Sequence, residues 1–353
     1  MRANALKHWC HDKMEATKVY HPLESSFWGY RFGCSLYNYI QKKLPILHFG
    51  YFYFLEFAAI HRKGEKIIGS RKFIDEVDRF KPSAVISMHS HLNHGYFHLL
   101  RKAVDSKLPF SVYAGELDDG IGFSRHWINP DINLFAGPTK ECCLAAVKRG
   151  MPVPKCLAAG PLLRKAFHAN KPKNRESVLR KYSLSPNCPT YLLSTGANGV
   201  NNHKQVANAF IRSGLECQLI ALCGKNNELV KNLNALDDRN HKIRIIPLKT
   251  VSDEVMRDLL ESVDFVFARP GAGICTEVLV SKCRIIFDLS GGIMPQEINN
   301  LNYWKRHASK VITCSNPSDL PKLALQVSDL PILSLPISER PSLLLDSVTK
   351  LSR

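Results

Sequence analysis

Short apolar runs alternate with helix-like stretches along most of the chain. In its first half the strand-like runs lie at 83–88, 110–113, 132–135 and 157–160. They are apolar on both faces, as strands buried in a parallel sheet are. Helix-like stretches near 69–80 and 139–149 separate them. This alternation predicts a Rossmann-like α/β domain over residues 1–167.

A second series of strands follows a polar, proline-bounded segment at 168–189, which we expect to link two domains. Its strand-like runs lie at 190–195, 217–222, 243–247, 264–268 and 284–287. We therefore expect a second α/β domain over 190–335, followed by a C-terminal helix within 336–353. Ligands of such sheets bind at the carboxyl ends of the strands.

Composition narrows the classes of function. The chain has 353 residues and a formal net charge of +17, with the excess spread along it. Such charge suits a phosphorylated substrate or an anionic membrane surface. No nucleic-acid-binding motif accompanies it, so we expect no nucleic-acid partner. The eleven cysteines lack the spacings of metal sites, so we expect reduced thiols and no bound metal.

A stretch rich in aromatic and basic residues lies near the start of the chain. Its apolar part, Leu44–Ile60, is interrupted by Pro45 and Glu56 and is too short to span a bilayer. Aromatic side chains favour the membrane interface, and lysines attract anionic headgroups. The candidate residues for membrane or acceptor contact are Tyr37, Tyr39, Lys42, Lys43, Phe49 and Tyr51. Packing in the domain core is the alternative.

A glycine motif follows the apolar run at 264–268. It comprises Arg269, Gly271, Ala272 and Gly273, with Glu277 one helical turn further on. Glycines leave room for a pyrophosphate at a helix N-terminus, and a carboxylate can accept both hydroxyls of a ribose. The alternative for Glu277 is an acidic side chain favoured by the helix dipole.

Three further motifs suit the same ligand. Small residues follow the run at 190–195, where backbone N–H groups can approach a phosphate. A cluster of amide and carboxylate side chains near residue 300 suits sugar hydroxyls, which both donate and accept hydrogen bonds. An arginine just before the link can bind a diphosphate through two hydrogen bonds. These candidate donor-binding residues are Thr195, Gly196, Ala197 and Gly199, then Gln296, Glu297 and Asn300, and Arg164. A plain turn, a polar loop and a surface arginine are the respective alternatives.

In this order, the motifs resemble those of glycosyltransferase family 28 over roughly residues 80–310. That family includes the monogalactosyl- and monoglucosyl-diacylglycerol synthases and the enzyme that adds N-acetylglucosamine to the peptidoglycan lipid precursor. The resemblance implies the GT-B fold, in which two Rossmann-like, doubly wound parallel-sheet domains face a cleft. It also implies a UDP-sugar as co-substrate, bound by the C-terminal domain, and no cofactor.

The aromatic and basic segment at 37–54 is similar to one in the diacylglycerol glycosyltransferases, which implies a lipid acceptor. Two positions depart from the family pattern. Ile274 stands where the family has a threonine, and Thr276 lies two residues on. The family also begins with a strand and a glycine-rich loop carrying a histidine, whereas Arg2–Leu6 resembles the helix that follows. We therefore expect the N-terminal domain to lack its first strand.

An inverting enzyme of this class needs a general base for the acceptor hydroxyl. Without the usual histidine, the candidates are His89, His91, Glu116 and Asp118, all expected at strand ends. Structural hydrogen bonding is the alternative for each histidine. The expected function is transfer of a hexose from a UDP-sugar to a lipid such as diacylglycerol, by a cytoplasmic protein peripheral on the inner face of the membrane. A UDP-sugar 2-epimerase and a catalytically degenerate partner protein are the alternatives.

Overall fold

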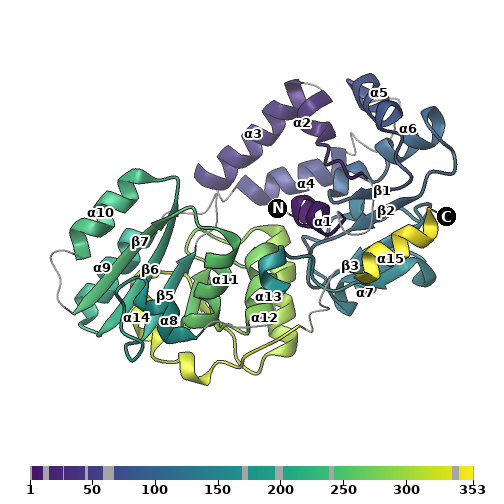
Figure 1. Ribbon diagram of the computed structural model, residues 1–353. Coiled ribbons are helices and arrows are strands. Elements are labelled where there is room, and N and C mark those ends of the chain that lie inside the picture. The colour runs from purple at the N-terminus through teal and green to yellow at the C-terminus, as the bar shows by residue number, and fades with distance from the viewer. Residues whose placement is uncertain are drawn as a thin grey trace. The chain divides into compact units, whose positions relative to one another are not determined.

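The computed structural model describes residues 2–10, 16–26, 28–43, 47–58, 67–168, 174–194, 202–237, 242–335 and 342–352. The chain divides into two units. Unit 1 comprises 1–164, 294–303 and 337–353, and unit 2 comprises 165–293 and 304–336. Each unit is built on one parallel sheet with helices on both faces (Figure 1).

The sheet of unit 1 has four parallel strands in the order β1-β2-β3-β4. They are β1 (Val85–Ser87), β2 (Phe110–Tyr113), β3 (Leu134–Gly137) and β4 (Cys156–Ala158). In register, Val85 lies opposite Phe110, and Phe135 lies opposite Cys156. Each strand overlaps one of the apolar runs in the first half of the chain, so the predicted strands are confirmed.

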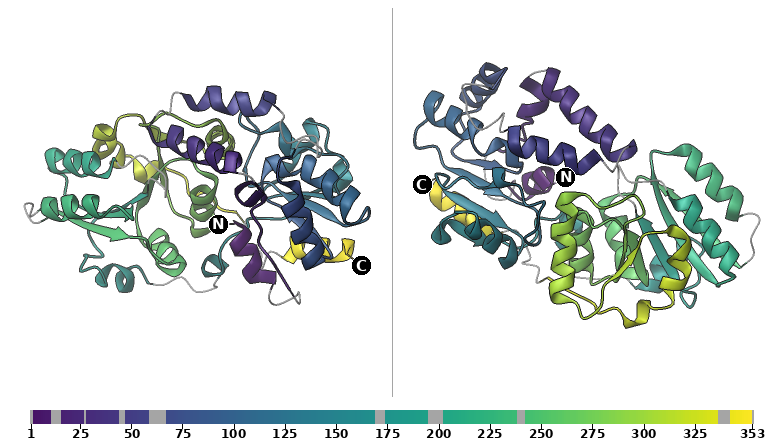
Figure 2. Two further views of the ribbon diagram at one scale, coloured as in Figure 1. Left: turned by 90° about the horizontal axis from the view of Figure 1, so that it is seen from above. Right: turned by 180° about the vertical axis from the view of Figure 1, so that it is seen from behind.

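Helices cover both faces of this sheet (Figure 2). Helices α5 (Ser70–Phe80), α6 (Gly95–Ala103) and α7 (Lys140–Lys148) bury Phe73, Tyr96 and Cys142 against one face. Helices α1 (Arg2–Cys10) and α15 (Ser342–Leu351) bury Trp9 and Leu345 against the other. The predicted C-terminal helix thus packs on the sheet of unit 1.

Three more helices of unit 1 follow α1: α2 (Pro22–Ser26), α3 (Trp28–Lys43) and α4 (His48–Ala58). Helix α3 contacts both α2 and α4. The Tyr51 hydroxyl of α4 donates a hydrogen bond of 3.3 Å to the carbonyl oxygen of Gly33 in α3. The aromatic and basic segment predicted from the sequence therefore forms a pair of packed helices.

The sheet of unit 2 has six parallel strands in the order β10-β9-β8-β5-β6-β7. They are β5 (Thr190–Ser194), β6 (Cys217–Gly224), β7 (Ile243–Lys249), β8 (Phe265–Ala268), β9 (Ile285–Asp288) and β10 (Ile312–Cys314). The first five coincide with the predicted runs. From β5 the chain first adds strands on one side and then, from β8, on the other. The strand order therefore reverses between β5 and β8, where doubly wound sheets bind their ligands.

Helices again lie on both faces of the sheet (Figure 1). Helices α9 (His203–Ser213), α10 (Asn227–Asp237) and α14 (Leu320–Ala324) bury Phe210, Leu233 and Leu320 in a core with Phe265 and Phe267. Helix α11 (Asp253–Ser262) contacts α8 (Arg175–Arg180) and α12 (Ala272–Ser281). Helix α13 (Pro295–His307) follows β9, and its first part belongs to unit 1.

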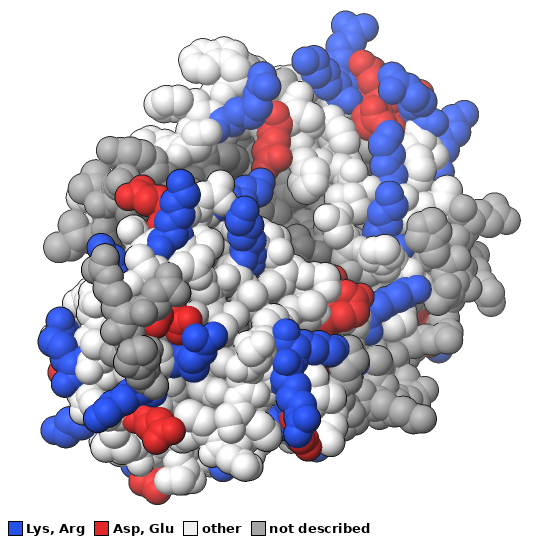
Figure 3. All heavy atoms as spheres, turned by 60° about the vertical axis from the view of Figure 1, so that its left-hand side comes forward, with Lys and Arg blue, Asp and Glu red and all other residues white. Residues whose placement is uncertain are grey.

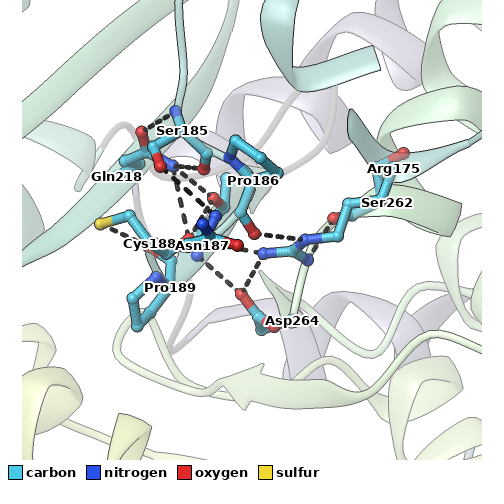
Figure 4. Close-up of polar contacts among 10 residues, drawn as sticks. Arg175, Ser185, Pro186, Asn187, Cys188, Pro189, Gln218, Ser262 and Asp264 are labelled. Carbon is cyan, nitrogen blue, oxygen red and sulfur yellow. Dashed lines mark hydrogen bonds and ion pairs between the residues drawn. The ribbon is translucent and has the colours of Figure 1, made fainter. Parts of the chain in front are cut away.

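The segment predicted as an interdomain link contains helix α8 and belongs to unit 2, where Arg175 binds it to the sheet (Figure 4). The Arg175 guanidinium donates to the carbonyl oxygens of Ser262 and Pro186 and pairs with Asp264 at 3.0 Å. Asp264 also accepts from the backbone N–H of Thr190, at the start of β5. One ion pair therefore connects α8 to the amino-terminal edge of the sheet.

Replacing Arg175 by alanine should lower the free energy of unfolding of unit 2 by roughly 2 kcal/mol, because hydrogen bonds to a charged group are lost and partly buried acceptors lose their donor. Urea unfolding would measure the change. Arg180→Ala is the matched control, because its pair with Glu176 joins two exposed side chains and contributes about 0.5 kcal/mol or less. Equal effects of the two substitutions would contradict this account of Arg175.

Candidate active site

The carboxyl ends of β5 and β8 meet where the strand order of unit 2 reverses. Both glycine-rich motifs follow these ends directly in the sequence. Thr195, Gly196, Ala197 and Gly199 lie outside the described residues. The second motif, which follows β8, lies entirely within the described residues, so the geometry of the candidate site is taken from it.

Backbone amides at the start of α12 form the centre of this motif. Gly271 caps the helix, and its N–H donates to the carbonyl oxygen of Arg269 at 2.7 Å. The half-buried Arg269 side chain donates to the carbonyl oxygen of Gly292 at 2.8 Å. The first turn of α12, which begins at Ala272 and Gly273, contains no acidic residue. Its N–H groups and helix dipole are therefore suited to an anion.

Glu277 lies one turn further along α12, and only 4% of its surface is exposed. A buried carboxylate is costly to desolvate unless it is hydrogen-bonded, so Glu277 is not a solvated helix residue. Its role in holding the ribose stays a prediction. Thr276 does not supply the phosphate-facing hydroxyl that Ile274 lacks. Its hydroxyl donates instead to the carbonyl oxygen of Ala272 within the helix, at 2.5 Å.

The start of α13 holds the predicted sugar-binding residues. Glu297 is buried, and its carboxylate accepts from the backbone N–H of Met294 at 2.9 Å, which caps the helix. The buried Asn300 amide oxygen accepts from the backbone N–H of Leu117 at 3.2 Å. Gln296 is half-buried. Its amide nitrogen donates to the Met294 sulfur at 3.8 Å, so all three side chains have hydrogen-bond partners within the protein.

Gly122 allows the loop that follows β2 to approach this part of α13. A β-carbon at Gly122 would lie 1.9 Å from the carbonyl oxygen of Pro295, so no larger residue fits. Asn302 donates to the carbonyl oxygen of Asp119 at 3.1 Å in the same contact. The loop at 115–122 and the start of α13 therefore form one packed element within unit 1.

Arg164 is half-buried at the end of unit 1. The turn before it is fixed by Tyr113, whose hydroxyl donates to the carbonyl oxygen of Gly160 at 2.9 Å and accepts from the N–H of Leu162 at 3.0 Å. This turn requires glycine, because Gly160 has a φ of 81°. The backbone thus holds Arg164 at the carboxyl-terminal side of β4.

A histidine cluster lies beyond the carboxyl end of β1. The rings of His89 and His91 lie 5.5 Å apart, and those of His91 and His126 lie 4.9 Å apart. His94 approaches His126 at 6.3 Å. His126 comes from the 3-10 turn η4 (Arg125–Trp127) and was not a sequence candidate. No local sequence signal marks it, because the contact joins segments 35 residues apart.

Glu116 and Asp118 occupy the loop after β2 rather than the histidine cluster itself. Glu116 accepts from its neighbour Gly115 at 3.0 Å and from the indole N–H of Trp127, in η4, at 3.3 Å. Asp118 is 1% exposed. His89 is exposed, His91 and Glu116 are both half-buried and Asp118 is buried, so His89 is the most accessible of the four candidate bases. Which group acts as base stays a prediction.

Of the predicted membrane-contact residues, the side chains of Tyr37, Tyr39, Lys42 and Lys43 lie outside the described residues. Phe49 and Tyr51 are half-buried, and Tyr51 packs α4 onto α3. The exposed aromatic side chains of α4 include Phe54 and Phe57, at 59% and 76% exposure. The most accessible apolar surface of α4 therefore lies one to two turns beyond the predicted residues.

Glu56 fixes α4 to the element that carries His126. Its carboxylate accepts from the Ser124 hydroxyl at 2.5 Å and from the backbone N–H of Arg125 at 3.0 Å. The His126 ring donates to the carbonyl oxygen of Leu55 at 3.3 Å, and the Arg125 guanidinium lies over the Phe57 ring at 5.8 Å. The exposed aromatics thus occupy a helix that is hydrogen-bonded to the histidine cluster.

Lys and Arg side chains are scattered over the face drawn in Figure 3, with Asp and Glu between them. In the described parts of the chain, no helix combines the length and apolar character that crossing a bilayer requires. Among the same residues, no three His, Cys, Asp or Glu side chains gather as metal ligands.

Two parallel sheets covered by helices, with a glycine motif at the switch point of the second, define the GT-B class of fold. Solved structures agree. The chain is similar to MurG of Acinetobacter baumannii (TM-score 0.50, 14% identity, 80% of this chain and 71% of that one). It is also similar to a UDP-N-acetylglucosamine 2-epimerase from Neisseria meningitidis (TM-score 0.55, 12% identity, 79% of each chain). These similarities confirm the predicted fold.

Sequence relatives give the finer resemblance. The chain is 24% identical over 234 residues to a probable monogalactosyldiacylglycerol synthase of Oryza sativa, covering 64% of this chain and 44% of the relative. It is 26% identical over 187 residues to a processive diacylglycerol β-glucosyltransferase of Bacillus pumilus, covering 53% and 47%. No family model matches. The resemblance to glycosyltransferase family 28 is thereby confirmed, although the chain spans less than half the length of these relatives.

Proposed function

We propose that the chain is a UDP-sugar-dependent hexosyltransferase that glycosylates a lipid such as diacylglycerol at an anionic membrane surface. The observation that carries the proposal is the buried Glu277 in α12, directly behind the glycine motif at the switch point of unit 2. Its carboxylate is the group that would hold the ribose of UDP, while the first-turn amides of α12 would hold the diphosphate. The relatives that act on diacylglycerol support the acceptor class.

Transfer would proceed by displacement at the anomeric carbon of the sugar. A base removes the proton of the acceptor hydroxyl, the new glycosidic bond forms, and the bond to the UDP oxygen breaks, so UDP leaves with the electron pair. The negative charge that develops on the diphosphate is stabilised by the amides at the start of α12. His89 and His91 are the proposed bases, because His89 is the exposed candidate and the His91 ring lies 5.5 Å from it.

The membrane supplies the acceptor in this proposal. Helix α4 exposes Phe54 and Phe57, and the formal net charge of +17 favours anionic lipid. We therefore place the protein on the inner, cytoplasmic face of the membrane as a peripheral protein. A UDP-sugar 2-epimerase has the same fold, but its reaction needs no lipid acceptor and hence no exposed aromatic helix.

Sugar transfer from radiolabelled UDP-glucose, UDP-galactose and UDP-N-acetylglucosamine onto diacylglycerol vesicles tests the proposal. Label in the lipid fraction from one of these donors is the expected result, and it would identify the sugar. Conversion of UDP-N-acetylglucosamine without any acceptor would support the epimerase instead. Binding of UDP without turnover of any donor would overturn the enzyme proposal in favour of a degenerate partner.

A further inference from the structure

A buried polar cluster joins the start of α9 to the end of β9 in unit 2. Asp288, the last residue of β9, is fully buried, and one carboxylate oxygen accepts from the Asn202 amide at 2.9 Å. The other oxygen accepts from the backbone N–H and the hydroxyl of Ser290, at 3.0 and 2.6 Å. Asn202 is also buried and donates to the Ser290 hydroxyl at 3.1 Å. None of these three residues was a sequence candidate.

The cluster lies at the carboxyl edge of the sheet, where the candidate nucleotide site is. Asn202 directly precedes α9, the helix that follows the first glycine-rich segment in sequence. Ser290 belongs to the turn after β9, and Gly292 in the same turn accepts from Arg269 of the second motif at 2.8 Å. Gly292 has a φ of 76°, so the turn has a backbone conformation that favours glycine. One turn is therefore hydrogen-bonded to both sides of the switch point.

The chemistry of the two side chains allows only one direction for the hydrogen bond between Asn202 and Asp288. The Asp288 carboxylate can only accept, and the Asn202 amide nitrogen can only donate. Buried networks of this kind specify one arrangement, because an unsatisfied member is costly. Such a network fixes local geometry more strictly than apolar packing of the same side chains would.

We infer that Asn202 and Asp288 are a positioning pair for the donor site, which holds the start of α9 and the turn at Ser290–Gly292 in the arrangement that binds the nucleotide diphosphate. The inference rests on the proposed function, because it takes UDP as the ligand of unit 2. The two residues act through the backbone segments they connect and need not touch the ligand.

Asn202→Asp tests the pair by pH. It places two carboxylates at hydrogen-bond distance, and one of them must then take up a proton, with a raised pKa, to restore the contact. We expect the affinity of this variant for UDP, relative to the unaltered chain at the same pH, to be within about threefold at pH 5.5 and at least roughly tenfold lower at pH 8.

The titratable groups next to Asp288 do not change their charge between the two pH values at which UDP affinity is compared. Burial lowers the pKa of His203, which faces Asp288, to about 4. Burial likewise raises the pKa of the Cys314 thiol, which also faces Asp288, to about 12. Both groups therefore stay neutral between pH 5.5 and 8. Dividing the UDP affinity of the variant by that of the unaltered chain at the same pH cancels the effect of the ionisation of UDP itself.

Exchanging the two residues, Asn202→Asp with Asp288→Asn, restores the complementary pair. The amide oxygen introduced at position 288 can accept from Ser290, while the amide nitrogen beside it donates to the carboxylate introduced at position 202. We expect UDP affinity within about threefold of the unaltered chain at both pH values. Asn316→Asp is the matched control, since the exposed Asn316 caps a turn of the same unit by accepting from the N–H of Ser318. It should change UDP affinity at neither pH.

Isothermal titration with UDP, with thermal unfolding of each variant, separates the outcomes. Full affinity of Asn202→Asp at pH 8 would overturn the inference. A folded exchange variant that stays tenfold weaker than the unaltered chain would also overturn it. If Asn202→Asp alone unfolds at pH 8, recovery of both fold and UDP affinity in the exchange variant supports the pair. Absence of UDP binding by the unaltered chain would overturn the proposed function, and this inference with it.

Discussion

Replacing Glu277 by alanine should abolish measurable UDP binding while the protein stays folded. The side chain is 4% exposed in α12, behind the glycine motif at the switch point. A carboxylate that accepts both hydroxyls of a ribose makes two charge-assisted hydrogen bonds, and each contributes about 1.5–3 kcal/mol. Their loss corresponds to a decrease in affinity of at least roughly 100-fold.

Isothermal titration with UDP measures this change, and thermal unfolding shows whether the fold survives. Glu277→Gln keeps the shape but loses the charge and half of the acceptor capacity, so it should retain an intermediate affinity. The control is Glu254→Gln, which alters an exposed acidic residue in the first turn of α11 in the same unit. Unchanged affinity in folded Glu277→Ala would refute the assignment of the nucleotide site.

Strands β1 to β9 could be predicted because each contains a short apolar run that is visible in the sequence. Phe265–Ala268 and the run at 285–287 are examples, buried along their whole length. A parallel strand covered on both faces leaves this signal in its own residues. The position of the glycine motif after β8 follows from the same local pattern.

The missed features depend on contacts between distant segments. The Asn202–Asp288 contact spans 86 residues, and the contact of His126 with Leu55 spans 71. The polar composition of the segment at 168–189 predicted a link and not the helix α8. This helix is held by Arg175, whose acceptors Ser262 and Asp264 lie far away in the sequence. A local pattern cannot show which partner a polar side chain will meet.

Replacing Phe54 and Phe57 together by serine should weaken binding to anionic vesicles by roughly 100-fold or more. Both rings are exposed on α4, so they are available to the lipid interface. Burying a phenylalanine side chain is worth about 1.5–3 kcal/mol, and two such contributions exceed the roughly 2.7 kcal/mol that corresponds to about 100-fold. UDP affinity should not change, because neither residue is among the candidate donor-binding residues.

Co-sedimentation with vesicles of phosphatidylglycerol and diacylglycerol measures this prediction. Leu144→Ser is the matched control, because Leu144 is also 59% exposed in unit 1 but lies on α7, away from the aromatic helices in sequence. If both substitutions weaken vesicle binding equally, general surface hydrophobicity causes it and α4 has no special role. If neither weakens it, binding depends on charge alone, and raising the ionic strength should then release the protein completely. Retained but salt-resistant binding by the double variant would place the lipid contact on another part of the chain.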